Sequence, residues 1–173
     1  MAPYFETVKS FADVPFTDDG IETASFLEAS DGLVQMFDLL GSGVFGFVQA
    51  DIRGNIAGVR ARHATPCLVR LVRGLAFTCK ALQHMQKDTN SELHVCFKRS
   101  YDEVLKHHHN FVIRSVVTVA IRAVPRRDDF LSRIAQGSSV DKLNVELARW
   151  LEGLEKIVQH TSIFLERGGY GKV

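Results

Sequence analysis

The sequence predicts a single all-α domain, and three observations support that prediction. Apolar residues recur every three or four positions through most of the chain, which is the period of an amphipathic helix. No segment alternates apolar and polar residues clearly enough to indicate a strand. The 173 residues, 46% of them hydrophobic and 24% charged, fit one ordinary globular domain with a core of its own.

The two ends of the chain carry weaker signals than the middle. Phe5, Val8 and Phe11 recur at helical spacing and predict a short helix, but the rest of residues 1–20 is mixed in composition. Residues 167–173 are rich in glycine, which favours flexibility. We therefore expect one domain over residues 1–173, with both end segments loosely ordered.

A glycine-rich corner joins two helices predicted in the first half of the chain. The first runs from about residue 23 to 40, with Thr23 as its N-cap, and the second from about 44 to 62. The second carries Asp51 and Asn55, which lie four residues apart and so share one helix face. A carboxylate beside an amide can hold hydroxyls or an amide of a polar ligand, although a solvated polar face has the same spacing.

Five further helices are predicted in the rest of the chain. Their approximate ranges are 67–85, 92–108, 110–124, 128–136 and a last helix from the SSVD turn to residue 165. The segment 110–124 is rich in Val and Ile, as a strand would be. However, its polar residues fall at every fourth position, at Asn110, Arg114, Thr118 and Arg122, which indicates a helix.

Composition excludes several functional classes. A net charge of +1 gives no support to nucleic-acid binding. Cys67, Cys79 and Cys96 are odd in number and match neither a zinc site nor a disulfide framework. The chain has no apolar run of transmembrane length and no signal peptide at its start, so we expect a cytoplasmic protein.

No set of residues predicts catalysis or metal binding. The triple histidine from His107 to His109 is conspicuous, but adjacent residues on a helix point about 100° apart and cannot share one metal ion. Asp51 and His109 could form an acid–base pair, yet no nucleophile motif accompanies them. We expect no enzyme activity, no metal and no cofactor.

Several motifs in a fixed order resemble one known family. They are FDLLGS (37–42), ADIRGNI (50–56), LVRGLAFTCKAL (71–82), SYDEVLKHHHNFVI (100–113) and AVPRRDDFL (123–131). Together they resemble the glycolipid transfer protein family, fungal members in particular. The resemblance implies a two-layer helical sandwich that binds a sphingolipid and transfers it between membranes without vesicles or catalysis.

The resemblance also implies residue roles. Asp51 and Asn55 would hold the headgroup and the sphingoid amide, His109 the amide or acyl carbonyl, and Arg70 would face the headgroup. Phe111 would touch the membrane, where the family usually has Trp. The hydrocarbon pocket would be lined by Phe37, Val44, Phe77, Leu105, Ile121 and Phe130, all of which could equally be ordinary core residues.

Two departures concern the headgroup. Glycolipid-binding members stack the first sugar on a Trp where this chain has Arg70, whereas the ceramide-1-phosphate branch has Arg there, a side chain suited to phosphate. That branch has a second Arg where this chain has Pro66. The glycolipid branch has a Lys at the position of Gly58, for which Arg60, Arg62 or Arg73 could compensate.

A third departure concerns the fold. The family has a further helix between the Asn-bearing helix and the Arg70 helix, whereas only the residues around His63 to Pro66 connect them here. We therefore expect a sandwich lacking one helix. Three alternatives to a glycolipid carrier stay open: a ceramide-1-phosphate-type carrier, a sphingolipid sensor or adaptor that does not transfer lipid, and a helical scaffold that binds none.

Overall fold

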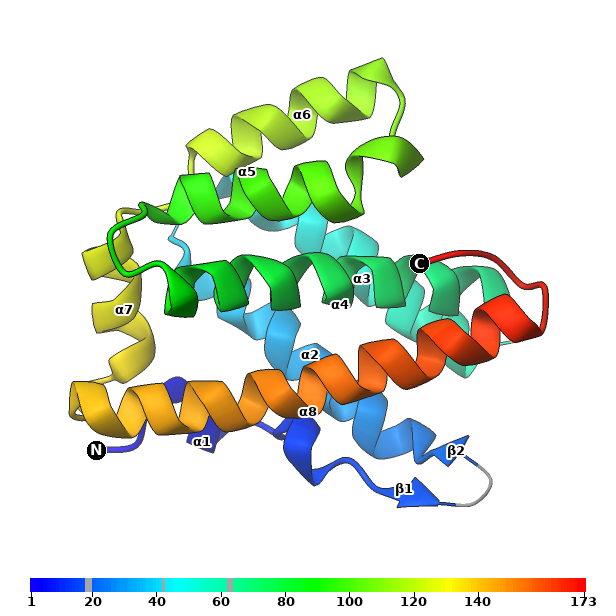
Figure 1. Ribbon diagram of the computed structural model, residues 1–173, viewed down its shortest axis with the longest axis horizontal. Coiled ribbons are helices and arrows are strands. Elements are labelled where there is room, and N and C mark those ends of the chain that lie inside the picture. The colour runs from blue at the N-terminus through cyan, green and yellow to red at the C-terminus, as the bar shows by residue number, and fades with distance from the viewer. Residues whose placement is uncertain (18–19, 42, 62–63) are drawn as a thin grey trace.

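The computed structural model describes residues 1–17, 20–41, 43–61 and 64–173, without the side chain of Val44. Over these residues the chain forms eight α-helices, three 3₁₀ turns and one two-stranded hairpin (Figure 1). The helices are α1 Tyr4–Thr7, α2 Thr23–Leu39, α3 Gly46–Arg60, α4 Ala64–Lys87, α5 Leu93–Val104, α6 Phe111–Arg122, α7 Arg127–Ala135 and α8 Val140–Arg167. A helix therefore forms in every segment where the periodicity predicts one, and the all-α prediction is confirmed.

Three local expectations are wrong. A short antiparallel hairpin does form, between β1 Phe16–Thr17 and β2 Gly20–Ile21. Helix α2 is capped by Glu22 rather than by Thr23, because the Glu22 carboxylate accepts hydrogen bonds from the N–H groups of Ala24 and Ser25 at 2.9 and 2.7 Å. The helix expected to reach residue 108 ends at Val104, and a 3₁₀ turn follows it.

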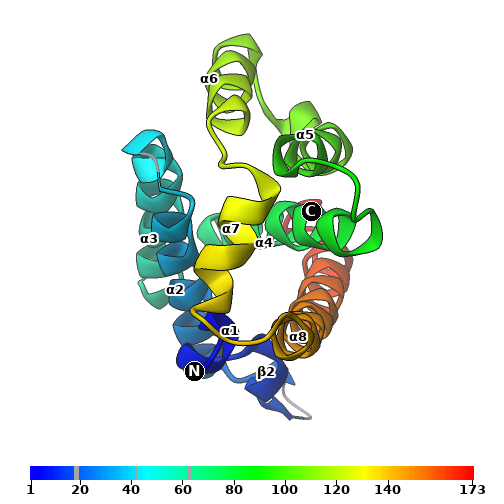
Figure 2. The same cartoon turned by 90° about the vertical axis from the view of Figure 1, so that its left-hand side faces the viewer.

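The helices form two layers. Figure 1 shows α4, α5 and α8 in front, with α2 and α3 behind them. The side view shows α7 between the two layers and α6 at the outer edge, beyond α5 (Figure 2). Helix α4 lies at the centre, because it packs against α3, α5 and α8. In the described part of the chain, none of these helices has the length and apolar character needed to cross a bilayer.

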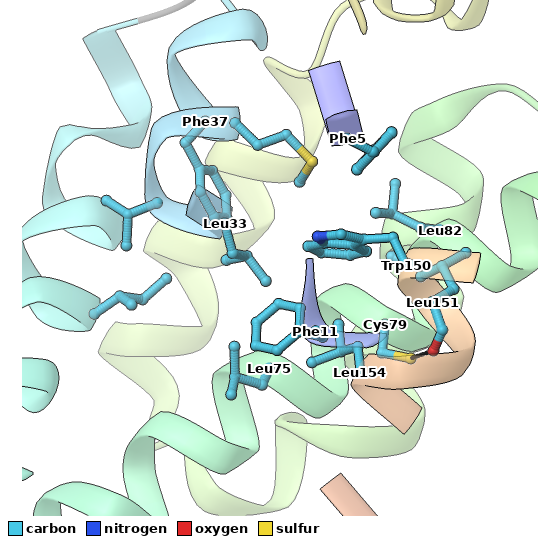
Figure 3. Packing of buried hydrophobic residues seen from close by; sticks show 14 of the residues in the cluster. Phe5, Phe11, Leu33, Phe37, Leu75, Cys79, Leu82, Trp150, Leu151 and Leu154 are labelled. Carbon is cyan, nitrogen blue, oxygen red and sulfur yellow. Dashed lines mark hydrogen bonds between the residues drawn. The ribbon is translucent and has the colours of Figure 1, made fainter. Parts of the chain in front are cut away.

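The core between the layers is built around Trp150 of α8 (Figure 3). The Trp150 ring is 1% exposed and lies 5.1 Å from the ring of Phe5 and 5.0 Å from that of Phe11, centroid to centroid. Each such aromatic side chain contributes about 1.5–3 kcal/mol through burial. The buried rings of Tyr4, Phe5 and Phe11 thus anchor the N-terminal segment in the core, which differs from the loose order expected of it, whereas Phe16 is exposed.

The C-terminal segment also makes specific contacts. The ring of Tyr170 lies 5.9 Å from that of Phe164. The guanidinium of Arg73, on α4, donates hydrogen bonds from Nε and Nη2 to the carbonyl oxygen of Lys172, at 2.8 and 2.5 Å. These contacts place the segment 168–173 beside α4 and α8. The segment is therefore held by specific contacts, which differs from the loose order expected from its glycines.

Candidate functional site

A cleft of about 660 Å³ opens between α3, α4, α5 and α6. This volume lies within the range of small-molecule sites in proteins. Most of its wall is apolar, from Phe45, Phe47, Val48, Ile52, Phe97, Val112, Ile113, Val116, Val117, Ala120 and Val124, besides the predicted residues below. Its polar groups are few: Asp51, Arg70, Arg73, Thr78, His108 and His109. An apolar cleft with a few polar groups suits an amphiphilic ligand.

Asp51 and Asn55 lie on the face of α3 that the spacing predicts. Asp51 lines the cleft and is exposed, whereas Asn55 is buried behind it, with 5% of its surface exposed. The Asn55 side-chain amide donates a hydrogen bond to Oδ2 of Asp51 at 3.1 Å. This contact orients the carboxylate and leaves further lone pairs of Asp51 free for donors on a ligand.

His109 faces Asp51 from another element. The chain leaves the 3₁₀ turn 106–108 in an extended conformation at His109, and Asn110 then caps α6 by accepting a hydrogen bond from the N–H of Ile113 at 3.0 Å. Nδ1 of His109 lies 3.2 Å from the hydroxyl oxygen of Tyr101. Because His109 is not helical, the 100° separation of adjacent helical residues does not keep it from sharing a metal ion with a neighbour. Among the described residues, however, no three groups of ligating type come together.

Burial is the main cause that lowers the pKa of His109, and Arg114 and Arg73 lower it further. The carboxylate of Asp51 acts in the opposite direction, so it lies close enough to interact with the imidazole across the cleft. The pKa of His108 is also lowered, chiefly by burial. His109 is therefore uncharged at neutral pH and can act as a neutral hydrogen-bonding group.

This lowered pKa predicts an acid-dependent loss of stability. An imidazole in the unfolded chain titrates near pH 6.5, so the unfolded state takes up a proton at a higher pH than the folded state does. The free energy of unfolding should thus fall as pH decreases from about 6.5 towards the lower folded-state pKa, and not change above that window. Urea unfolding from about pH 7.5 to pH 5 should show this slope, and His109→Gln should make it shallower. An equal slope in the variant would contradict the assignment to His109.

Arg70 and Arg73 lie one helical turn apart on α4, and both line the cleft. Burial and the positive charge of Arg70 lower the pKa of Arg73. Gly74 follows them, and a Cβ at Gly74 would meet no atom within 4 Å, so it leaves the cleft open beside the two guanidiniums. Arg73 already donates from Nε and Nη2 to the carbonyl oxygen of Lys172, so it contributes mainly its positive charge to the opening. Together the two charges favour an anionic or strongly polar group.

The position where the resemblance places a Lys has a packing explanation. A Cβ at Gly58 would collide with Sγ of Cys67, because α3 and α4 approach closely there. A larger side chain would separate the two helices. Of the residues that could compensate, Arg60 pairs on the surface with Asp31 at 3.7 Å, and Arg62 lies outside the described residues. Among the three candidates, only Arg73 is placed in the cleft by the structure.

The residues expected in the hydrocarbon pocket divide into three groups. Those that line the cleft are Phe37, Phe77, Leu105 and Ile121. Phe130 does not line it: this side chain is fully buried in the core, because α7 packs against α1, α2 and α8. The side chain of Val44 lies outside the described residues. Phe111, the expected membrane contact, is 82% exposed at the start of α6.

Two features of the cleft were not predicted from the sequence. One is the apolar face of α6, which supplies five lining residues besides the predicted Ile121: Val112, Ile113, Val116, Val117 and Ala120. The four-residue spacing of polar residues in this segment was the signal that could have identified that face. The other is the contact of Tyr101 with His109, for which the spacing of eight residues gave no signal, because a turn interrupts the helix between them.

Comparisons with known proteins agree on one family. The sequence pattern of the family described as Glycolipid transfer protein (GLTP) matches residues 21–66 and 60–136. A glycolipid transfer protein of Aureobasidium melanogenum is 35% identical over 187 residues, covering 94% of this chain and 92% of the relative.

Solved structures lead to the same family. The crystal structure of HET-C2, a fungal glycolipid transfer protein, superposes with a TM-score of 0.88 at 37% identity, covering 94% of this chain and 96% of that one. Mouse ceramide-1-phosphate transfer protein, at 18% identity, has a TM-score of 0.85 with 97% and 98% coverage and shares the fold. The chain belongs to the glycolipid transfer protein family, whose members bind and transfer lipids and are not enzymes.

Proposed function

We propose that this protein binds one sphingolipid in the cleft and carries it between membranes, with 1–173 acting as a single domain. The observation that supports this most is the combination in one cleft of long apolar walls with Asp51 and His109. A secondary amide carries both an N–H donor and a carbonyl acceptor. The carboxylate of Asp51, oriented by Asn55, would accept the donor, and a protonated nitrogen of His109 would donate to the acceptor.

The apolar surface of α6 supports a hydrocarbon ligand and a membrane encounter. Val112 is 68% exposed, Val116 45% and Val119 60%, so much of this helix lacks a protein partner in the described structure. Two of these side chains, Val112 and Val116, line the cleft, where acyl or sphingoid chains would cover them at about 0.8 kcal/mol per buried CH₂. Phe111 projects at the start of the same helix and would insert into the bilayer during lipid exchange at the cytoplasmic face.

The headgroup is either a sugar or a phosphate. The glycolipid transfer proteins of fungi that resemble this chain favour a sugar. Ceramide-1-phosphate is the second candidate, and the observation that favours it is the pair of guanidiniums, Arg70 and Arg73, on the cleft wall. The fold alone does not choose between them, because mouse ceramide-1-phosphate transfer protein has the same architecture.

We also propose that this chain lacks a segment present in its relatives between α3 and α4. The alignment with the Aureobasidium protein spans 187 positions against the 173 residues of this chain, so the relative has at least 14 residues without a counterpart here. The family pattern matches in two pieces that both include residues 60–66, at the α3–α4 connection. His63, where the connection was expected, lies outside the described residues.

A vesicle assay tests the function. Donor vesicles carry a fluorescent glucosylceramide or a fluorescent ceramide-1-phosphate, and the measured quantity is the rate at which each lipid reaches acceptor vesicles. Transfer of either lipid supports a carrier. Binding without transfer would favour a sensor or adaptor, and a folded protein that neither binds nor transfers would favour a scaffold; both results would overturn the proposed function.

Arg70 decides the headgroup preference. Arg70→Gln removes the positive charge but keeps hydrogen-bonding capacity, so it should weaken ceramide-1-phosphate binding by roughly 10-fold or more if a charge-assisted contact to phosphate exists. Glucosylceramide binding should change by less than about threefold, because the uncharged sugar headgroup forms no ion pair that the loss of the guanidinium could break. Equilibrium titration with each lipid measures both effects. Arg60→Gln, on the surface pair with Asp31, is the matched control.

A further inference from the structure

Tyr101 lies in a fixed position behind His109. It belongs to α5, and only 2% of its surface is exposed. The ring of Phe77 stands nearly perpendicular to it, with centroids 6.4 Å apart, and the His109 ring lies 5.8 Å away on another side. Phe97 packs on Phe77 in turn, at 5.6 Å. This aromatic packing leaves the Tyr101 ring a single orientation, so its hydroxyl group is held against His109.

The chemistry of the two groups sets the direction of their hydrogen bond. The Tyr101 oxygen lies 3.2 Å from Nδ1 of His109. Burial raises the pKa of Tyr101, so the hydroxyl keeps its proton, and burial lowers that of His109, so the imidazole is neutral. If His109 donated from Nδ1, the buried hydroxyl proton would point towards apolar surroundings that include Phe77. Leaving that proton unpaired costs more than leaving a lone pair of the oxygen unused.

From this geometry we infer that Tyr101 is a positioning residue: it donates to Nδ1 of His109 and so fixes the imidazole with its proton on Nε2. A neutral imidazole has one donor and one acceptor nitrogen, and occupation of Nδ1 by Tyr101 leaves Nε2–H as the group offered to a ligand. His109 then contacts a hydrogen-bond acceptor, while Asp51 contacts a donor. This inference rests on the proposed function, because it assigns the roles within the same lipid site.

The tautomer can be measured without any lipid. Long-range proton–nitrogen NMR correlations on the ¹⁵N-labelled protein distinguish a protonated ring nitrogen from an unprotonated one. The His109 signals among those of the seven histidines are identified by their loss in His109→Gln. We expect Nδ1 to be the unprotonated nitrogen at neutral pH, and Tyr101→Phe to give averaged signals of both tautomers. A proton on Nδ1 in the unmodified protein would overturn the inference, whether or not the protein carries lipid.

Lipid binding then tests the consequence. Tyr101→Phe should weaken the binding of whichever ceramide-based lipid the protein takes up by about 3- to 10-fold, the size of one hydrogen-bond effect. Tyr4→Phe is the matched control: its hydroxyl is also buried and donates to the carbonyl of Gly32 at 2.6 Å, and neither residue lines the cleft. We expect Tyr4→Phe to leave lipid affinity unchanged.

A double variant separates positioning from general loosening of the cleft. Glutamine has a fixed N–H donor and no tautomers, so in the His109→Gln background a further Tyr101→Phe change should cost less than about twofold. An equal cost of Tyr101→Phe in both backgrounds would show that it acts through packing alone and would overturn the inference. If the unmodified protein binds neither lipid, the proposed function fails, while the NMR result still decides the tautomer.

Discussion

Replacing Asp51 with Asn is expected to reduce sphingolipid binding and transfer by at least about 10-fold while the protein stays folded. The two side chains have nearly the same shape, so α3 should stay intact. The hydrogen bond from the Asn55 side-chain amide, which is 3.1 Å long to Oδ2 of Asp51, should persist with the new side-chain amide oxygen at position 51 as its acceptor. What is lost is the negative charge. A hydrogen bond to a charged group contributes about 1.5–3 kcal/mol, roughly twice the value of a neutral one.

The matched control for this prediction is Asp31→Asn. Asp31 is a partly exposed carboxylate whose pairing with Arg60, at 3.7 Å, lies outside the cleft. Exposed ion pairs contribute little to stability, so transfer and unfolding should both stay within experimental error. If Asp51→Asn transferred lipid at the unmodified rate, the carboxylate would have no part in binding, and the proposed ligand site would have to be abandoned.

The sequence predicts the helices and the family because both depend on local information. An apolar period of three to four residues specifies each helix without knowledge of its neighbours, and the prediction of the glycolipid transfer protein family is confirmed. The same applies to Asp51 and Asn55, whose hydrogen bond follows from four residues of helix. Features that depend on a single helix could therefore be predicted from the sequence.

What could not be predicted depends on contacts between elements. Phe130 has the same apolar side chain as Phe77, yet one lies in the closed core and the other on the cleft wall, because α7 and α4 face different neighbours. Helical geometry was expected for His107 to His109, but the chain turns at residues 106–108 and brings the His109 ring next to Tyr101. Apolar composition alone does not tell a core residue from a cleft residue.

The close approach of the N-terminal segment to α8 is another such contact, and it predicts a large loss of stability in Gly153→Ala. A Cβ at Gly153 would lie 2.5 Å from the carbonyl carbon of Phe11 and would also collide with the backbone N of Ala12. Backbone atoms cannot move aside as a flexible side chain can, so the 3₁₀ turn 11–13 would have to leave α8 or α8 would have to bend. We expect a net destabilisation of about 1–3 kcal/mol or more, even though alanine is otherwise the better helix former.

Urea unfolding measures this effect, and Gly54→Ala provides the matched control. Gly54 lies in the middle of α3, where an added Cβ would meet no atom within 4 Å, so alanine there should stabilise the protein by up to about 1 kcal/mol through helix propensity alone. Opposite signs for the same substitution in two helices would show that the N-terminal segment is tightly packed on α8. Stabilisation at both positions would mean that this segment is as loosely ordered as its composition suggests, and that Phe5 and Phe11 are not permanent neighbours of Trp150.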